Sequence, residues 1–232
     1  MSTLKSSQEV QNYLGCHPIV ARIIWNREFR TTSEIDQLMK PELSQLPDPK
    51  TILDMTKAVA RTIDAIANDE PIAVYGDYDV DGTCGSSLLV DFFKSLGVEV
   101  LHYQPNRFTE GYGVHSAAIE TLIDQGAQLI LTVDCGITAV DPAKVCRTRG
   151  VDLIVLDHHK VGAELPDAYA IVDPQRPEDT SGLKTLCGTA LAFFFVMTLR
   201  SELREAGFFE ERAEPNLMRL LDLVAIATVA DV

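Results

Sequence analysis

The chain has 232 residues, of which 46% are hydrophobic and 23% charged, and this balance favours a globular protein over a disordered one. No apolar run reaches the roughly 18 residues that cross a bilayer, and the N-terminus lacks the apolar core of a signal peptide, so we expect a cytoplasmic protein without membrane contact. The net charge of −14 argues against a surface that holds nucleic acid by general attraction to phosphate.

The first 50 residues predict a helical arm. "HPIVARIIWNREF" and "TSEIDQLM" place apolar residues at helical spacing, and the proline-containing "KPELSQLPDPK" follows them. We therefore expect an N-terminal helical arm over 1–50 and a main domain over 51–232.

In the main domain, short apolar runs alternate with amphipathic stretches. Helices are expected over 51–68, 84–96, 115–125 and 138–149, and strands over 72–75, 98–101, 129–133 and 152–156. A proline-rich loop then leads to "LCGTALAFFFVMTLRSELREAG" and "EPNLMRLLDLVAIATVADV", which predict further helices. Strands that are apolar on both faces are typical of a parallel sheet covered on both sides. The expected fold is α/β, a doubly wound and mostly parallel sheet with helices on both faces, a helical N-terminal arm and a helical C-terminal segment.

Carboxylates and imidazoles directly follow the predicted strands. In an open parallel sheet, ligands bind beyond the carboxyl ends of the strands, so these positions are informative. They are Asp77, Asp79 and Asp81 after the first strand, Asp134 after the third, Asp157, His158 and His159 after the fourth, and Asp231 at the end of the last helical segment. One such aspartate is often only a helix N-cap, but several strands deliver them here. We expect the three alternate aspartates to point the same way from a strand end.

So many carboxylates at one edge predict bound cations. Desolvated like charges repel strongly unless they are protonated or bridged. Oxygen ligands with one or two imidazoles suit Mn²⁺ or Mg²⁺, and the histidines favour Mn²⁺. Two ions about 3.5–4 Å apart would clamp a phosphoryl group and acidify a water for in-line attack.

Glycine-rich turns suggest anion contacts near the same edge. Gly82 and Gly85 lie at the start of the helix after the first strand, whose backbone N–H groups could meet an anion. "RFTEGYGVHS" also places a glycine-rich turn before a predicted helix, and Arg107 in it could bind a phosphate, although Gly-Tyr-Gly is also an ordinary turn.

The ordered motifs "GDYDVDGT", "PNRFTEGYG", "TVDCGI", "VLDHH", "LCGTALAF" and "IATVADV" resemble the DHH phosphoesterase superfamily, and most closely its RecJ-type single-stranded-DNA-specific exonucleases. The resemblance runs from about residue 18 to the last residue. It implies a metal-dependent 5′-to-3′ exonuclease that degrades single-stranded DNA in recombination and repair by two-metal activation of water. A single-strand-binding protein and a helicase are the partners that it suggests.

The same resemblance implies a role for each motif residue. Metal ligands would be Asp79, Asp81, Asp134 as the bridging ligand, His158 and Asp231, with Asp77 as a ligand or a partner of one. His159 would face the substrate phosphate or support the metal ligands, and Asp157 would orient the imidazoles. Arg107 and the Gly188 turn would contact phosphate or DNA.

The chain departs from this family in its extent. RecJ-type enzymes continue beyond the fourth motif into a DHHA1 domain and an OB-fold, and neither is present here. We therefore expect a domain truncated after the fourth motif, which binds Mn²⁺ but degrades single strands poorly.

Three alternatives stay open. "DVDGT" fits the opening of haloacid-dehalogenase-type phosphatases, but the chain offers only Lys160 and no late "GDxxxD", and "LDHH" would have no role. Another DHH activity is a closer alternative: oligoribonuclease, cyclic-dinucleotide phosphodiesterase or pyrophosphatase. "RFTEGYG" and the long arm favour the exonuclease over these. The third alternative is a non-catalytic scaffold, and the retained ligand residues argue against it.

Overall fold

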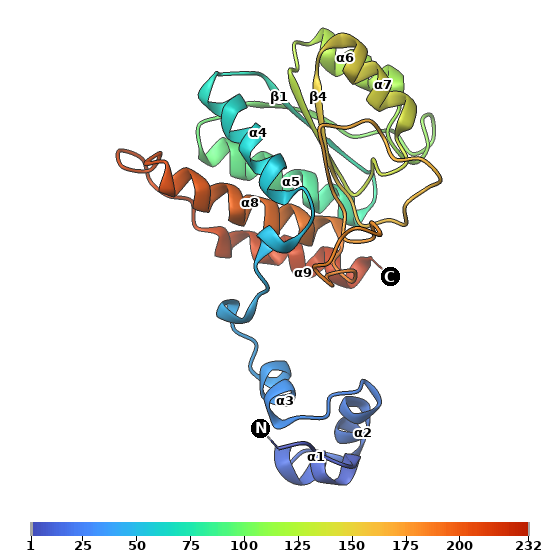
Figure 1. Cartoon of the computed structure of the whole chain (residues 1–232), viewed down its shortest axis with the longest axis vertical. Coiled ribbons are helices and arrows are strands. Elements are labelled where there is room, and N and C mark those ends of the chain that lie inside the picture. Colours follow the sequence, from blue (N-terminus) through green and yellow to red (C-terminus); the bar gives the residue numbers. More distant parts are fainter. Residues whose placement is uncertain (1, 232) are drawn as a thin grey trace. The chain divides into compact units, whose positions relative to one another are not determined.

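The computed structural model describes residues 2–231, and the chain divides into two compact units, Met1–Asp48 and Pro49–Val232 (Figure 1). The smaller unit contains α1 (Ser7–Leu14), α2 (Pro18–Asn26), α3 (Thr32–Met39) and the 3-10 helix η1 (Leu43–Gln45). The larger unit contains η2 (Pro49–Thr51), α4 (Met55–Ala67), β1 (Ile72–Gly76), α5 (Val80–Ser95), β2 (Val100–Tyr103), α6 (Ser116–Asp124), β3 (Leu129–Val133), α7 (Val140–Arg149), β4 (Asp152–Leu156), β5 (Ala170–Val172), α8 (Gly188–Glu205), η3 (Leu217–Leu220) and α9 (Leu221–Ala230).

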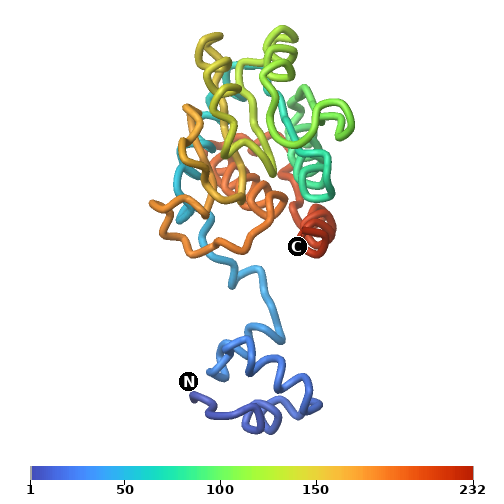
Figure 2. The backbone as a smooth tube through the Cα atoms, turned by 90° about the vertical axis from the view of Figure 1, so that its right-hand side faces the viewer, coloured from blue at the N-terminus to red at the C-terminus, as the bar shows by residue number. Residues whose placement is uncertain are grey.

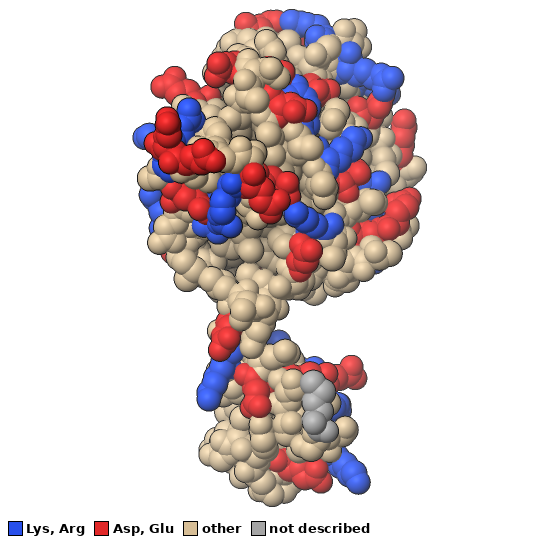
Figure 3. All heavy atoms as spheres, turned by 60° about the vertical axis from the view of Figure 1, so that its left-hand side comes forward, with Lys and Arg blue, Asp and Glu red and all other residues tan. Residues whose placement is uncertain are grey.

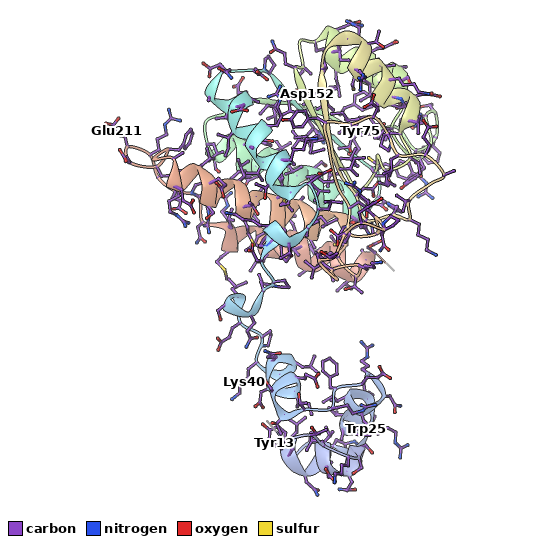
Figure 4. The ribbon with its side chains drawn as sticks, viewed as in Figure 1. Tyr13, Trp25, Lys40, Tyr75, Asp152 and Glu211 are labelled. Atoms are coloured by element: carbon purple, nitrogen blue, oxygen red, sulfur yellow. The ribbon has the colours of Figure 1, made fainter. Side chains whose placement is uncertain are left out.

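The smaller unit is a set of short, well-capped helices around a small core. A capping box between Thr31 and Glu34 begins α3, which satisfies backbone N–H groups that would otherwise lack partners. The Arg30 guanidinium lies 3.8 Å from the centre of the Trp25 ring. Figure 4 labels Trp25 and Tyr13 within this unit. Its buried side chains are Val10, Ala21, Ile24 and Ile35.

The larger unit is built on a five-stranded sheet in the order β2-β1-β3-β4-β5, with every neighbouring pair parallel. Chain order reverses between β1 and β3, because β2 lies on one side of β1 and the later strands lie on the other. This is a topological switch point, where the loops after two strands diverge and leave room for a ligand.

Helices cover both faces of this sheet. On one face, α4, α5 and α8 pack on strand side chains such as Val74 and Leu131, while α6 and α7 cover the other face over Ala73 and Ile130 (Figure 1). Tyr75, labelled in Figure 4, is completely buried in the second layer. The last helix, α9, runs beside α5 (Figure 2). This architecture confirms the expected α/β fold with a parallel sheet covered by helices on both faces.

Three local differences separate the structure from the sequence prediction. β2 lies two residues later than the apolar run at 98–101, and α5 begins at Val80 rather than near 84 because the Asp79 side chain caps its first turn. A fifth strand, β5, was not predicted, since its apolar run is only three residues long.

None of the helices in the described part of the chain combines the length and the hydropathy that a membrane-crossing segment needs. Acidic and basic side chains are interspersed over the face of the larger unit drawn in Figure 3.

Candidate metal centre

The three aspartates after β1 occupy different structural positions. Asp79 is the N-cap of α5, and its Oδ1 accepts a hydrogen bond from the Gly82 N–H at 2.9 Å. Asp81 lies inside the first turn of α5, and Asp77 lies in the turn between β1 and that helix. The expected strand-end alternation was wrong, because β1 ends at Gly76 and helical geometry begins before Asp81, but Asp77 and Asp79 still place ligand atoms within 4.8 Å of each other.

The N-terminus of α8 holds Asp81. Gly188 N–H donates to Asp81 Oδ2 at 2.5 Å, and Thr189 N–H donates to Oδ1 at 2.8 Å. These N–H groups lie at the positive end of the helix dipole, which favours an ionised partner. Gly188 is buried and its N–H donates to Asp81, so its backbone holds that carboxylate, and a contact with substrate stays a prediction.

Close packing explains the glycines near this edge better than anion binding does. A Cβ on Gly82 would lie 2.5 Å from the backbone N of Asp77, and a Cβ on Gly85 would lie 2.6 Å from Val133 Cγ2. The Gly82 N–H is also occupied by Asp79. These two glycines therefore let α5 approach β1 and β3 closely, and the expected anion contact of their N–H groups does not fit the Gly82 geometry.

Asp134 follows β3 and lies under the start of α8. Its φ of +61° is in the left-handed region, which is uncommon for a residue other than glycine and is found at functional sites. The Asp134 N–H donates to Leu156 O at 3.0 Å, which ties this turn to the end of β4. Its carboxylate Oδ1 lies 3.0 Å from His158 Nε2.

Asp157 orients both histidines that follow β4. Its Oδ1 accepts the backbone N–H of His158 at 2.8 Å and lies 2.7 Å from the His159 Nδ1, while its Oδ2 accepts the Ile137 N–H at 2.8 Å. The bond to Asp157 raises the pKa of His159. Because Nδ1 faces a carboxylate, Nε2 of His159 is the nitrogen left for another partner.

His158 brings the remaining carboxylates together. Its Nε2 lies 3.6 Å from Asp81 Oδ2 and 3.7 Å from Asp231 Oδ2, in addition to the contact with Asp134. Three groups in residues 2–231 each place three ligand atoms within 4.8 Å of one another: Asp77 with Asp79 and Asp134, Asp81 with His158 and Asp231, and Asp134 with His158 and His159. Asp134 and His158 each belong to two of these groups, so the candidate ligand sets adjoin.

The electrostatics of the cluster fit divalent cations. Burial, followed by the charges of Asp81 and Asp79, raises the pKa of Asp134, and burial also raises the pKa of Asp77. Asp77 Oδ1 is buried without a hydrogen-bond partner among the described residues. A buried carboxylate oxygen without a donor is costly, and a cation would satisfy it. The donors, mainly carboxylate oxygens with one or two imidazoles, suit Mn²⁺ or Mg²⁺.

Arg107 lies outside these ligand groups, on the loop between β2 and α6. Its guanidinium carbon is 5.5 Å from the centre of the Tyr78 ring, which follows Asp77 in the turn after β1. The structure thus links Arg107 to the first acidic motif through an aromatic ring.

Two residues that sequence reasoning missed lie beside the cluster. Asp173 directly follows β5 and is fully buried; burial raises its pKa to about 7 against a hydrogen bond from the Gln175 N–H. "AIVD" repeats the strand-then-aspartate pattern of "LTVD" and "IVLD", so that pattern could have revealed it. Tyr112 places its hydroxyl 3.2 Å from His159 Nε2, a contact that no local motif predicts.

Comparison with known proteins agrees with this geometry. The profile described as "DHH family, N-terminal domain" matches residues 71–228, which is well over half of the chain. The chain belongs to the DHH family. The matched region runs from just before β1 almost to the end of α9, so it includes every candidate ligand except Asp231.

Individual DHH relatives are single-stranded-DNA-specific exonucleases called RecJ. The Haemophilus influenzae protein is 34% identical over 96% of this chain, and the Escherichia coli protein is 38% identical over 93%. The chain spans 38% and 37% of their respective lengths. A crystal structure of RecJ in complex with Mn²⁺ from Thermus thermophilus superposes with a TM-score of 0.74 at 28% identity, and covers all of this chain and 31% of that one.

Proposed function

We propose that the chain is the catalytic part of a 5′-to-3′ exonuclease that hydrolyses single-stranded DNA in recombination and repair with two divalent cations, Mn²⁺ in preference to Mg²⁺. The observation that carries the proposal is the convergence of Asp134 and His158 with carboxylates from the turn after β1 and the end of α9. The DHH family and the RecJ relatives support the choice of substrate. The proposal also treats 1–50 as a helical arm and 51–232 as the DHH domain.

The chain's own residues would hold and orient the reacting groups. Divalent cations bound here would activate a water and stabilise charge on the phosphoryl group. Asp77, Asp79 and Asp134 would form one ligand set and Asp81, His158 and Asp231 the other, and the two sets adjoin where Asp134 Oδ1 lies 3.0 Å from His158 Nε2. Asp157 would fix the His159 ring so that, as an imidazolium, it donates from Nδ1 to Asp157 and from Nε2 to a phosphate oxygen, and Arg107 would bind a neighbouring phosphate.

Metal titration by calorimetry tests the metal sites. Asp134→Ala should abolish at least one Mn²⁺ binding event, because Asp134 belongs to two ligand groups. Asp141→Ala is a matched control, since Asp141 is an exposed carboxylate on α7 whose only polar contact described is with Lys144. Equal Mn²⁺ binding by the wild type and Asp134→Ala would contradict the proposal and favour a scaffold.

A substrate panel with Mn²⁺ tests the reaction. Single-stranded DNA labelled at either end, duplex DNA, short RNA, cyclic dinucleotides and pyrophosphate separate the exonuclease from other DHH activities. We expect slow release of nucleotides from the 5′ end of single strands, and preferential turnover of pyrophosphate or a cyclic dinucleotide would overturn the assignment. The same proposal includes a helicase and a single-strand-binding protein as partners and a cytoplasmic location, which this substrate panel does not test.

A further inference from the structure

Phe108 is the most exposed large hydrophobic side chain in the described part of the chain. It is 95% exposed and belongs to none of the hydrophobic clusters. A phenyl ring left in water lacks the stabilisation that its burial would provide, so a fully exposed ring next to a candidate site suggests a contact with a ligand.

The loop that carries Phe108 is braced. Asn106 Oδ1 accepts the Phe108 N–H at 2.9 Å, and the Asn106 backbone carbonyl accepts the N–H groups of Thr109 and Glu110. The Glu110 carboxylate in turn accepts the Asn106 N–H at 2.7 Å and the Tyr103 hydroxyl at 2.6 Å. These bonds fix the turn, so the ring is presented in one place and little entropy is lost when a ligand meets it.

Both ends of this loop are attached to the candidate metal centre. At one end, Gln104 Nε2 donates to the Asp77 carbonyl at 3.0 Å and to Thr83 Oγ1 at 2.6 Å. At the other end, the Tyr112 hydroxyl contacts His159. Phe108 therefore lies on a segment, 104–112, that runs between the two acidic motifs.

The neighbour of Phe108 carries the complementary charge. Arg107 is a cation, and its guanidinium carbon lies 5.5 Å from the centre of the Tyr78 ring, next to Asp77 in the chain. An arginine beside an exposed aromatic ring on a fixed loop is a pairing that suits a nucleotide strand, because the cation binds phosphate and the ring stacks on a base.

We propose that Phe108 is a stacking platform for an unpaired base of the strand next to the scissile phosphate. This inference rests on the proposed function. Every base has a π-face, so the contact is independent of sequence, but a base inside a duplex is already stacked and cannot use it. Phe108 thereby contributes to the choice of single strands over duplex.

Binding of two strands tests this proposal. One is a short 5′-phosphorylated dT strand and the other is a strand of equal length without bases, and both are measured by fluorescence anisotropy with Ca²⁺ in place of Mn²⁺. Phe108→Ala should weaken binding of the dT strand about 5- to 150-fold, and leave binding of the abasic strand unchanged. Phe108→Trp should retain the affinity, and its emission should be quenched by the dT strand only.

Tyr169→Ala is the control variant. Tyr169 is also an exposed aromatic residue, but it directly precedes β5 and so lies at the amino ends of the parallel strands, whereas the metal centre lies at their carboxyl ends. The Tyr169→Ala protein should bind both strands as the wild type does. Phe108→Leu tests whether an apolar side chain without a ring is enough, and we expect it to behave like Phe108→Ala.

Three results would overturn the inference: Phe108→Ala weakens binding of both strands equally, it leaves binding of the dT strand unchanged, or the wild type binds neither strand. Unchanged binding of the dT strand would indicate that the exposed ring contacts a protein partner instead. Hydrolysis of bis(p-nitrophenyl) phosphate with Mn²⁺ decides the proposed function separately, because that small diester has no base to stack. If the wild type does not hydrolyse this diester, the proposed phosphodiesterase activity is refuted, whatever the binding result for Phe108.

Discussion

Replacing Gly188 with alanine should destabilise the larger unit and disturb the metal centre together. A Cβ at this position would lie 2.7 Å from Asp134 Cβ and 2.9 Å from Asp134 Cα. The second contact is with backbone, so a change of rotamer cannot relieve it. The start of α8 would have to move away from β3, and its hydrogen bonds to Asp81 would lengthen.

The expected loss is the sum of two effects. Overpacking costs about 1–3 kcal/mol, and weakening hydrogen bonds to a buried carboxylate costs about 1.5–3 kcal/mol. The free energy of unfolding should therefore fall by about 2.5–6 kcal/mol. Without the clash the sign would be opposite, since alanine stabilises a helix by up to about 1 kcal/mol relative to glycine.

Urea unfolding of the metal-free protein measures this difference. Gly162→Ala is the matched control, because its Cβ would meet other atoms only at 3.6 Å and beyond, which is ordinary contact. Both positions lie in the larger unit, so the smaller unit contributes equally to both measurements. A Gly188→Ala protein as stable as Gly162→Ala would refute the reasoning, and so would Mn²⁺ affinity equal to that of the wild type.

Three further predictions concern charge and orientation around the centre. Burial raises the pKa of Asp173 from 3.8 to about 7, so the unfolded chain ionises first and the fold loses stability as the pH rises from about 4 to about 7; the stability that Asp173→Asn gains over the wild type in urea unfolding should therefore grow across that range and level off above it. Asp157→Asn should weaken Mn²⁺ binding about 10- to 100-fold by calorimetry, since the proposed ligand His158 loses the carboxylate that accepts its backbone N–H; an unchanged affinity would exclude this role. Arg107→Gln should lower affinity for single-stranded DNA and reduce the salt slope by about one, whereas Arg147→Gln on α7 should do neither.

The order of elements was predictable because each strand of the larger unit is buried on both faces. A run such as "LILTV" is apolar whichever way its side chains point, and this is the property of a strand in a covered parallel sheet. β5 was not predicted because three buried residues are too short an apolar run to indicate a strand. Asp173 was therefore missed as a site residue, although it follows its strand in the same way as Asp134 and Asp157 follow theirs.

The residues of the centre that carry charge were visible in the sequence, but the groups that hold them were not. Asp81 is recognisable from its motif, whereas its partners at Gly188 and Thr189 are more than a hundred residues away and contribute backbone N–H groups, which every non-proline residue has. The same holds for the contact between Tyr112 and His159, which depends on how two loops meet.

This division has a physical cause. Metal binding needs particular side chains, so the ligands appear in the sequence as motifs. Packing and backbone hydrogen bonds hold these ligands in place, and in the sequence they are visible at most as a glycine. Gly188 is an example, because only the structure shows that it lies against Asp134 and also donates to Asp81. It follows that Gly188→Ala, which changes no charged residue, should perturb Mn²⁺ binding through both carboxylates.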